Sequence, residues 1–158
     1  MKLYFLLLFS VIATFAHSQA LVDNFEVSDK LSWVTFGVGT NVIGGTSGAF
    51  DYTVQKKNNI FSGRLHAGSG GDSFASASFH YGLATRKMNG HYSATIGLAM
   101  TAGGNGTGGR YTGAGFAFGA QAFLKFGSIG LGVYAIGNIN SYQSNLSIMV
   151  AMQFGSLR

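Results

Sequence analysis

The chain has 158 residues, of which 25 are glycine and none is proline or cysteine, and its formal net charge is +5. Only 9% of the residues are charged, whereas soluble domains use about 25% to cover their surface. An ordinary soluble domain is therefore disfavoured. The missing cysteine excludes a disulfide framework and a lipid-modified N-terminal cysteine, and the scattered basic residues argue against a nucleic-acid surface.

The first 18 residues have the layout of a secretory signal peptide. Lys2 precedes an uncharged run from Leu3 to Ala16, and small residues, Ala16 and Ser18, stand before the expected cleavage site. The run is shorter than the ~20 residues of a spanning helix, so an uncleaved anchor is the weaker alternative. We expect export through the Sec pathway, and a helix over Leu3–Ala16 that lies outside the fold of the precursor.

The rest of the chain is long enough for one domain. Residues 19–30 contain three of the five acids, Asp23, Glu26 and Asp29, and are expected to form a polar periplasmic lead-in. Residues 31–158 contain no run of spanning-helix length. A secreted chain that is too apolar for water and lacks such a run can satisfy its backbone groups in lipid as a closed β-barrel.

Eight segments of residues 31–158 alternate between apolar and small or polar residues, which is typical of strands. The expected bounds are 31–40, 48–55, 60–67, 74–85, 91–101, 111–126, a run after Gly127-Ser128 that includes 131–139, and 145–155. Transmembrane strands need about 9–11 residues, and eight is the smallest even strand number of outer-membrane barrels. The fold class is therefore predicted to be all-β, an eight-stranded antiparallel up-and-down transmembrane barrel.

The last of these runs shows the alternation best. One parity is apolar, comprising Leu146, Ile148, Val150, Met152 and Phe154, and the other comprises Ser147, Met149, Ala151 and Gln153. No position that we assign to the apolar face of any run is charged, as a lipid-facing wall requires, because Lys or Arg at mid-membrane costs ~2–4 kcal/mol. The facing of the first run is the least clear. Val34, Phe36 and Val38 are expected outward and Trp33 inward, but Leu31 and Trp33 compete for the lipid-facing side.

The expected connections alternate between short and longer ones. The short ones are Lys56–Asn59, Arg86–Gly90 and Gly127–Ser128, and the longer ones are Asn41–Ser47, Gly68–Ser73, Ala102–Arg110 and Asn140–Ser144. In outer-membrane barrels short turns face the periplasm and longer loops the exterior. Both termini are therefore predicted to be periplasmic, and the glycine-rich Ala102–Arg110 is expected to be the longest loop.

Three charged residues within the expected strands, Asp51, Arg64 and Lys125, fall on the inward parity. A two-residue turn at Lys57-Asn58 places Asp51 opposite Arg64, and a slip by two residues places it opposite His66. We predict an internal ion pair between Asp51 and Arg64.

Serines and histidines share the inward faces and form the strongest candidate for chemistry. They are His66, His80 and His91, with Ser62, Ser76, Ser78 and Ser93. Nucleophilic catalysis needs a base within hydrogen-bond reach and a group that orients it, and Asp51 is the only acid within an expected strand. A polar network that fills the lumen is the favoured interpretation. The histidines lack metal-ligand spacing, so no catalytic, cofactor or metal residue is assigned.

Two glycine-containing stretches resemble known motifs only superficially. Gly71-Asp72-Ser73-Phe74 is similar to the opening motif of an esterase family, and Gly103–Gly109 to phosphate-binding loops. A phosphate loop directs its amides at the N-terminus of a helix, and no helix is expected here. Both stretches are interpreted as loop composition.

The pattern over Leu31 to Gly155 resembles the small outer-membrane β-barrels of Gram-negative bacteria, the OmpA-like and OmpX-like group. The likeness is strongest over Gly130–Asn140 followed by Leu146–Phe154. The resemblance is one of architecture and implies no catalytic motif. Barrels of this group usually end on an aromatic residue, whereas Phe154 is followed by four more residues, which bears on recognition by the barrel assembly machinery. No periplasmic domain is expected after the barrel.

We therefore predict a non-enzymatic integral protein of the cell outer membrane, with a structural or accessory-subunit role and a lumen filled by side chains. Its expected partners are outer-membrane lipid, a larger outer-membrane complex and, during biogenesis, the barrel assembly machinery. One alternative is a lipid-modifying enzyme that uses inner-face His and Ser. Another is a soluble secreted lipocalin-like carrier, in which the apolar parity would face inward. A glycine-rich surface fibre is disfavoured, since no internal repeat is visible.

Overall fold

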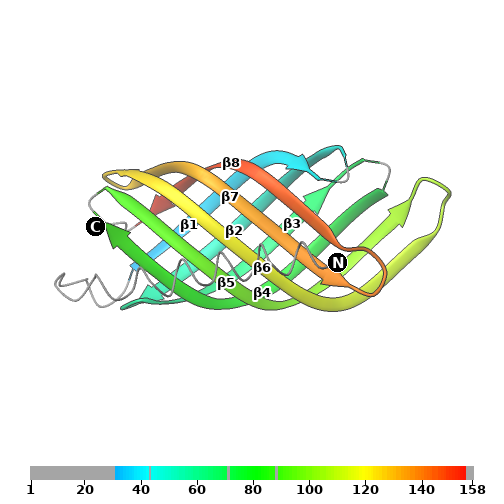
Figure 1. Cartoon of the computed structure of the whole chain (residues 1–158), viewed down its shortest axis with the longest axis horizontal. Coiled ribbons are helices and arrows are strands. Elements are labelled where there is room, and N and C mark those ends of the chain that lie inside the picture. The colour runs from blue at the N-terminus through cyan, green and yellow to red at the C-terminus, as the bar shows by residue number, and fades with distance from the viewer. Residues whose placement is uncertain (1–30, 43, 71, 88, 156–158) are drawn as a thin grey trace.

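The computed structural model describes residues 31–42, 44–70, 72–87 and 89–155. Within these ranges eight antiparallel strands follow one another in chain order around a closed barrel, which β1 closes against β8 (Figure 1). The strands are β1 (Leu31–Asn41), β2 (Thr46–Lys56), β3 (Asn59–Gly68), β4 (Asp72–Lys87), β5 (Gly90–Asn105), β6 (Arg110–Phe126), β7 (Ile129–Asn140) and β8 (Asn145–Gly155). The predicted fold class is confirmed.

Some predictions fall outside the described residues. These are the signal peptide at 1–18, its helix at Leu3–Ala16, the lead-in at 19–30 and the last three residues. Among the residues that are described, no helix combines the length and hydrophobicity needed to cross a membrane.

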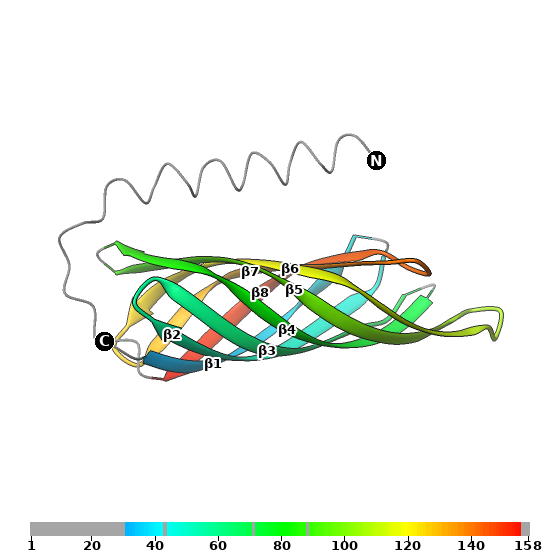
Figure 2. The ribbon, with the colours of Figure 1, turned by 90° about the horizontal axis from the view of Figure 1, so that it is seen from below.

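The predicted long loop at Ala102–Arg110 is wrong. Strand pairing continues through most of it, with Ala102 opposite Thr112 and Gly104 opposite Arg110, so that only residues 106–109 connect β5 to β6. Tyr111 lies against Gly103, and its hydroxyl donates to the carbonyl of Ser73 over 3.4 Å. An aromatic ring thus covers a glycine that would otherwise weaken the strand. The β5–β6 hairpin projects beyond the other connections (Figures 1 and 2).

The connections sort into the two predicted sets. Residues 57–58, 88–89 and 127–128 form two-residue connections at one end of the barrel, named here the turn end. The connections at the opposite end, the loop end, span residues 42–45, 69–71, 106–109 and 141–144. Trp33 near the start of β1 pairs with Gly155 at the end of β8, so the described chain starts and finishes at the turn end.

The predicted facing is confirmed. Val150 and Leu98 on the outer wall expose 68% and 67% of their surface, while Gln153 and Trp33 in the lumen expose 0% and 1%. Leu31, whose facing was the least clear, is buried as well. The barrel therefore carries its apolar parity outside and most of its polar side chains inside, opposite to a water-soluble domain.

Charge is absent from the middle of the outer wall. Among the described residues, charged groups other than those in the lumen stand at strand ends or in turns: Lys56 closes β2, Lys87 closes β4 and Arg110 opens β6. The central rows of the wall contain large apolar residues such as Phe79 and Phe116. This distribution matches the depth-dependent penalty for charge on a lipid-facing barrel wall.

Candidate functional site: the polar network of the lumen

The predicted ion pair lies in the middle of the lumen. Asp51 of β2 stands opposite Arg64 of β3, and Arg64 Nε donates to Asp51 Oδ2 over 2.9 Å with both side chains fully buried. Thr53 donates to Oδ1 over 2.5 Å, and Tyr134 of β7 donates to Oδ2 over 2.6 Å. The carboxylate thus has three donors in place of water, which a buried charge requires.

The Arg64 guanidinium makes further contacts around the lumen. It lies 4.9 Å from the centroid of the Tyr134 ring, and its Nη2 donates to Thr95 Oγ1 over 3.4 Å. Gly119 of β6 leaves room for it, because a Cβ there would lie 2.7 Å from Nη1 and 2.8 Å from Nη2. Side chains from β2, β3, β5 and β7 thus meet at one level and cross the lumen.

The structure brings one predicted histidine and serine together at this level. His80 Nε2 and Ser78 Oγ lie 2.7 Å apart, while His80 Nδ1 lies 3.5 Å from Arg64 Nη1. A guanidinium can only donate, so Nδ1 accepts, and a neutral ring then has its proton on Nε2. In that tautomer His80 donates to Ser78, and its Nε2 has no lone pair with which to take the serine proton. This is the reverse of the arrangement in a Ser-His-Asp triad.

The other two histidines have different neighbours. His66 Nε2 lies 2.9 Å from Ser147 Oγ, and its ring meets Phe74 edge-on at 4.8 Å. His91 meets Trp33 edge-on at 4.7 Å. The two carboxylates among the described residues are Asp51, which is bound to Arg64, and Asp72, which opens β4 at the loop end. Neither orients a histidine as a general base would need.

The predicted serines also fall into different surroundings. Ser76 accepts hydrogen bonds from Thr101 over 3.3 Å and from Asn138 over 3.1 Å, and Asn138 also donates to Thr101. Ser62 and Ser93 are buried without a hydrogen-bond partner among the described residues. No described group of three His, Asp or Glu side chains could hold a metal ion.

Several members of the network had no role in the sequence analysis. Tyr134 and Asn138 fall on the inward parity of β7, and Gln153 of β8 donates to Gln121 of β6 over 3.0 Å. The inward parity of these residues was the available signal. Their partners lie between 32 and 83 positions away in the chain, a separation that a pairing rule for adjacent strands does not reach.

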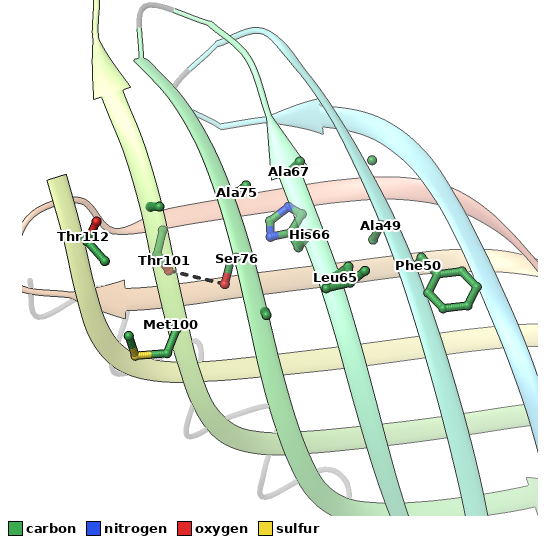
Figure 3. Close-up of a pocket in the computed structure, with 13 residues that line it drawn as sticks. Ala49, Phe50, Leu65, His66, Ala67, Ala75, Ser76, Met100, Thr101 and Thr112 are labelled. Atoms are coloured by element: carbon green, nitrogen blue, oxygen red, sulfur yellow. Dashed lines mark hydrogen bonds between the residues drawn. The ribbon is translucent and has the colours of Figure 1, made fainter. Parts of the chain in front are cut away.

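The outer wall has an apolar groove of about 650 Å³ near the loop end (Figure 3). A row of small outward residues crosses five strands there, and its successive members are register partners: Gly48, Ala67, Ala75, Ala102 and Thr112. Larger residues, Phe50, Leu65 and Met100, border the row. The groove is thus a shallow apolar depression in the outer wall, lined by small side chains.

No protein-family model and no curated protein sequence matches the chain. Similar solved structures exist. The N-terminal β-barrel domain of Pseudomonas aeruginosa OprF has a TM-score of 0.67 at 10% identity and covers 82% of this chain and 99% of its own. A de novo designed transmembrane β-barrel has a TM-score of 0.52 at 12% identity, with 83% and 99% covered. Neisserial surface protein A has a TM-score of 0.49 at 9% identity, with 81% and 96% covered.

These identities are low, so the likeness concerns the fold alone. Strand number, chain-order closure and outward apolar facing agree with it. The chain therefore has the fold of the small eight-stranded outer-membrane β-barrels.

Proposed function

We propose that the protein is a non-enzymatic integral barrel of the outer membrane with a structural or accessory role and without a general pore. The observation that carries the proposal is the inverted surface, in which large apolar side chains face outward and the ion pair is buried inside. Water would solvate such a wall poorly, whereas lipid favours it. A lipocalin-like carrier would need the opposite facing.

The filled lumen supports the absence of a pore. Eight strands leave an interior just wide enough for side chains, and here Tyr134, Asp51 and Arg64 meet across it. In this proposal the chain is exported through the Sec pathway, loses residues 1–18, is inserted by the barrel assembly machinery and keeps both termini in the periplasm.

The groove supports an accessory role. Small residues let another membrane-embedded surface approach the backbone closely and pack against it, and the row from Gly48 to Thr112 provides such a place on five strands. The outer wall could thus join a larger complex while the lumen serves only stability.

Gel mobility and permeability test the proposal. Protein from an outer-membrane fraction should migrate differently before and after boiling, since a folded barrel resists detergent. Reconstituted vesicles should show no protein-dependent swelling in solutions of small sugars. Extraction without detergent, or swelling that depends on sugar size, would contradict the proposal.

Cysteine labelling in intact cells tests the orientation. The chain has no native cysteine, so Ser144→Cys at the loop end and Ser128→Cys at the turn end are a matched pair of exposed sites. A membrane-impermeant maleimide should label position 144 and leave position 128 unlabelled until the cells are broken. The reverse pattern would place the termini outside.

The lipid-modifying alternative makes its own prediction. Arg64 holds His80 as a donor toward Ser78, so His66→Ala and His80→Ala should leave the lipid A of the membrane unchanged by mass spectrometry. A changed lipid A in either variant, with the barrel still folded by gel shift, would favour the enzyme.

A further inference from the structure

A group of basic side chains lies inside the turn end of the barrel. We name Arg86, His91 and Lys125 the inner basic cluster. Arg86 and Lys125 share the inward parity of the buried Ala84 and Phe123 on the same strands, and both are half-buried. His91 is fully buried, and so are the Nε and Nη2 atoms of Arg86. Positive charge is thus held inside the lumen, where water reaches it only in part.

The three side chains are close enough to act on one another. Arg86 of β4 is the register partner of His91 of β5. The Lys125 amide of β6 donates to the carbonyl of Asn89, which directly precedes β5, over 2.7 Å. Arg86 interacts electrostatically with His91 and with Lys125. Like charges this close repel, so the inner basic cluster favours an anionic partner.

The acids of the chain leave one segment as the source of that partner. The chain has five Asp and Glu residues. Asp51 is bound to Arg64 in the middle of the lumen, and Asp72 lies at the loop end, where Gln143 donates to it over 3.3 Å. The other three acids all belong to the lead-in at residues 19–30. Within the chain, a side-chain carboxylate for the inner basic cluster can therefore come only from the lead-in.

The lead-in joins the barrel beside the inner basic cluster. Leu31, the first residue of β1, is 2% exposed and packs in a buried cluster that includes Ala84 of β4. Arg86 follows Ala84 by two residues on the same face of β4. Side chains two apart in an extended chain point to the same side, so an extended backbone before Leu31 would direct Asp29 inward as well. Two residues span at most ~7 Å, which keeps Asp29 near this mouth of the lumen.

We propose that the acidic lead-in docks over the turn-end mouth of the lumen, with the Asp29 carboxylate paired to the Arg86 guanidinium. Charge complementarity and a short tether both favour this docking, because a short flexible linker gives an effective concentration in the millimolar range. Arg86 is partly removed from water, so a carboxylate gains more there than beside an exposed lysine. Docking needs only the closed barrel and does not depend on the proposed function.

Zero-length crosslinking tests the docking. A carbodiimide activates a carboxylate, and a lysine amine in contact with it then forms an amide that mass spectrometry locates. Arg86→Lys keeps the positive charge and supplies this amine. The full chain, folded in zwitterionic micelles at low ionic strength, should join Asp29 to position 86 at least about fivefold more often than to Lys56 or Lys57.

Lys56 and Lys57 are the control for a lead-in that moves freely. Both are exposed, and they follow Gln55, the register partner of Leu31. They therefore stand on the strand next to β1, where a free lead-in would meet them first. Asp29→Asn should remove the amide at position 86, and about 1 M salt should reduce it, since salt screens a half-buried pair in part.

Three outcomes would overturn the proposal. Amides at Lys56 and Lys57 without an excess at position 86 would show a free lead-in. An amide at position 86 from a carboxylate other than Asp29 would show another pairing. Loss of the amide on adding phosphatidylglycerol to the micelles would show that lipid headgroups occupy the site.

Gel mobility reports folding of each sample separately. Should Arg86→Lys not fold, the wild-type chain still decides, because Lys125 is a native amine of the inner basic cluster. An amide from the lead-in to Lys125, in excess over those to the two turn lysines, is then expected. Its absence from the folded wild-type chain would overturn the proposal.

Discussion

The side chain of Asp51 determines how the middle of the lumen is held together. Its carboxylate accepts from Arg64 on the next strand, from Thr53 two residues on, and from Tyr134 across the barrel. One strand pair and one contact across the lumen therefore depend on a single charge. Because the Asp51 carboxylate is removed from water, the loss of any one of these donors should lower the stability of the folded barrel.

A double-mutant cycle tests this dependence. Asp51→Asn should lower the free energy of unfolding by ~3–5 kcal/mol, because Arg64 would be left as a buried, unpaired charge. Adding Arg64→Met should recover part of the loss, since no charge then stays in the lumen. Urea unfolding in micelles, followed by fluorescence of the buried Trp33, measures both. Additive losses in the double variant would mean that the two residues are not coupled.

At the scale of elements, two glycines differ in what surrounds them. Gly97 of β5 faces the lumen so close to β4 that an added Cβ would overlap the Phe79 carbonyl oxygen and approach His80 Cα to 2.9 Å. An added Cβ at Gly63 on the outer wall would lie 3.9 Å from the Phe79 ring, an ordinary contact.

Alanine at these two positions should therefore have opposite effects. Gly97→Ala should lower the free energy of unfolding by ~1–3 kcal/mol, because backbone must move to admit the methyl group. Gly63→Ala should be neutral or stabilise by up to ~1 kcal/mol, since glycine weakens a strand. The same urea experiment compares them. Equal stability of the two variants would show that the close approach of β4 and β5 is unimportant.

The β2–β3 turn contains the other element-scale prediction. Lys57 has a φ of 55°, a left-handed conformation that side chains with a Cβ adopt at a cost. Lys57→Gly should raise the free energy of unfolding by ~0.5–1 kcal/mol, and Lys57→Val should lower it. Unchanged unfolding midpoints in both variants would argue against a strained turn.

At the scale of the whole molecule, the cost of placing a charge on the outer wall should depend on how deep in the membrane the position lies. Leu98 lies in a central row of the wall with 67% of its surface exposed, and Val42 lies in a loop-end connection with 57% exposed. Leu98→Arg should destabilise the protein in bilayers by ~2–4 kcal/mol, and Val42→Arg by ~0–1 kcal/mol. Reversible unfolding from vesicles gives both values. Similar penalties at both positions would show that the wall does not face hydrocarbon.

Contacts between adjacent strands could be predicted from the sequence, whereas contacts between distant strands could not. The ion pair of Asp51 and Arg64 followed from one two-residue turn, because a turn sets the register of the strands that it joins. The Ala102–Arg110 loop was predicted wrongly, since glycine content alone does not show that Tyr111 covers Gly103 and lets pairing continue. The partners of His66 and Asn138 depend on how the barrel closes, which no adjacent pair of strands determines.

The sequence by itself determined the strand number, the facing of each wall and the sorting of the connections, because alternation and turn composition are local properties that survive in any closed barrel. The tertiary structure alone decided which inward side chains of non-adjacent strands meet. Tilt and stagger place residues from distant strands at the same height. Tyr134 reaches Asp51, and His66 reaches Ser147, because closure brings β2, β3, β7 and β8 around one narrow lumen.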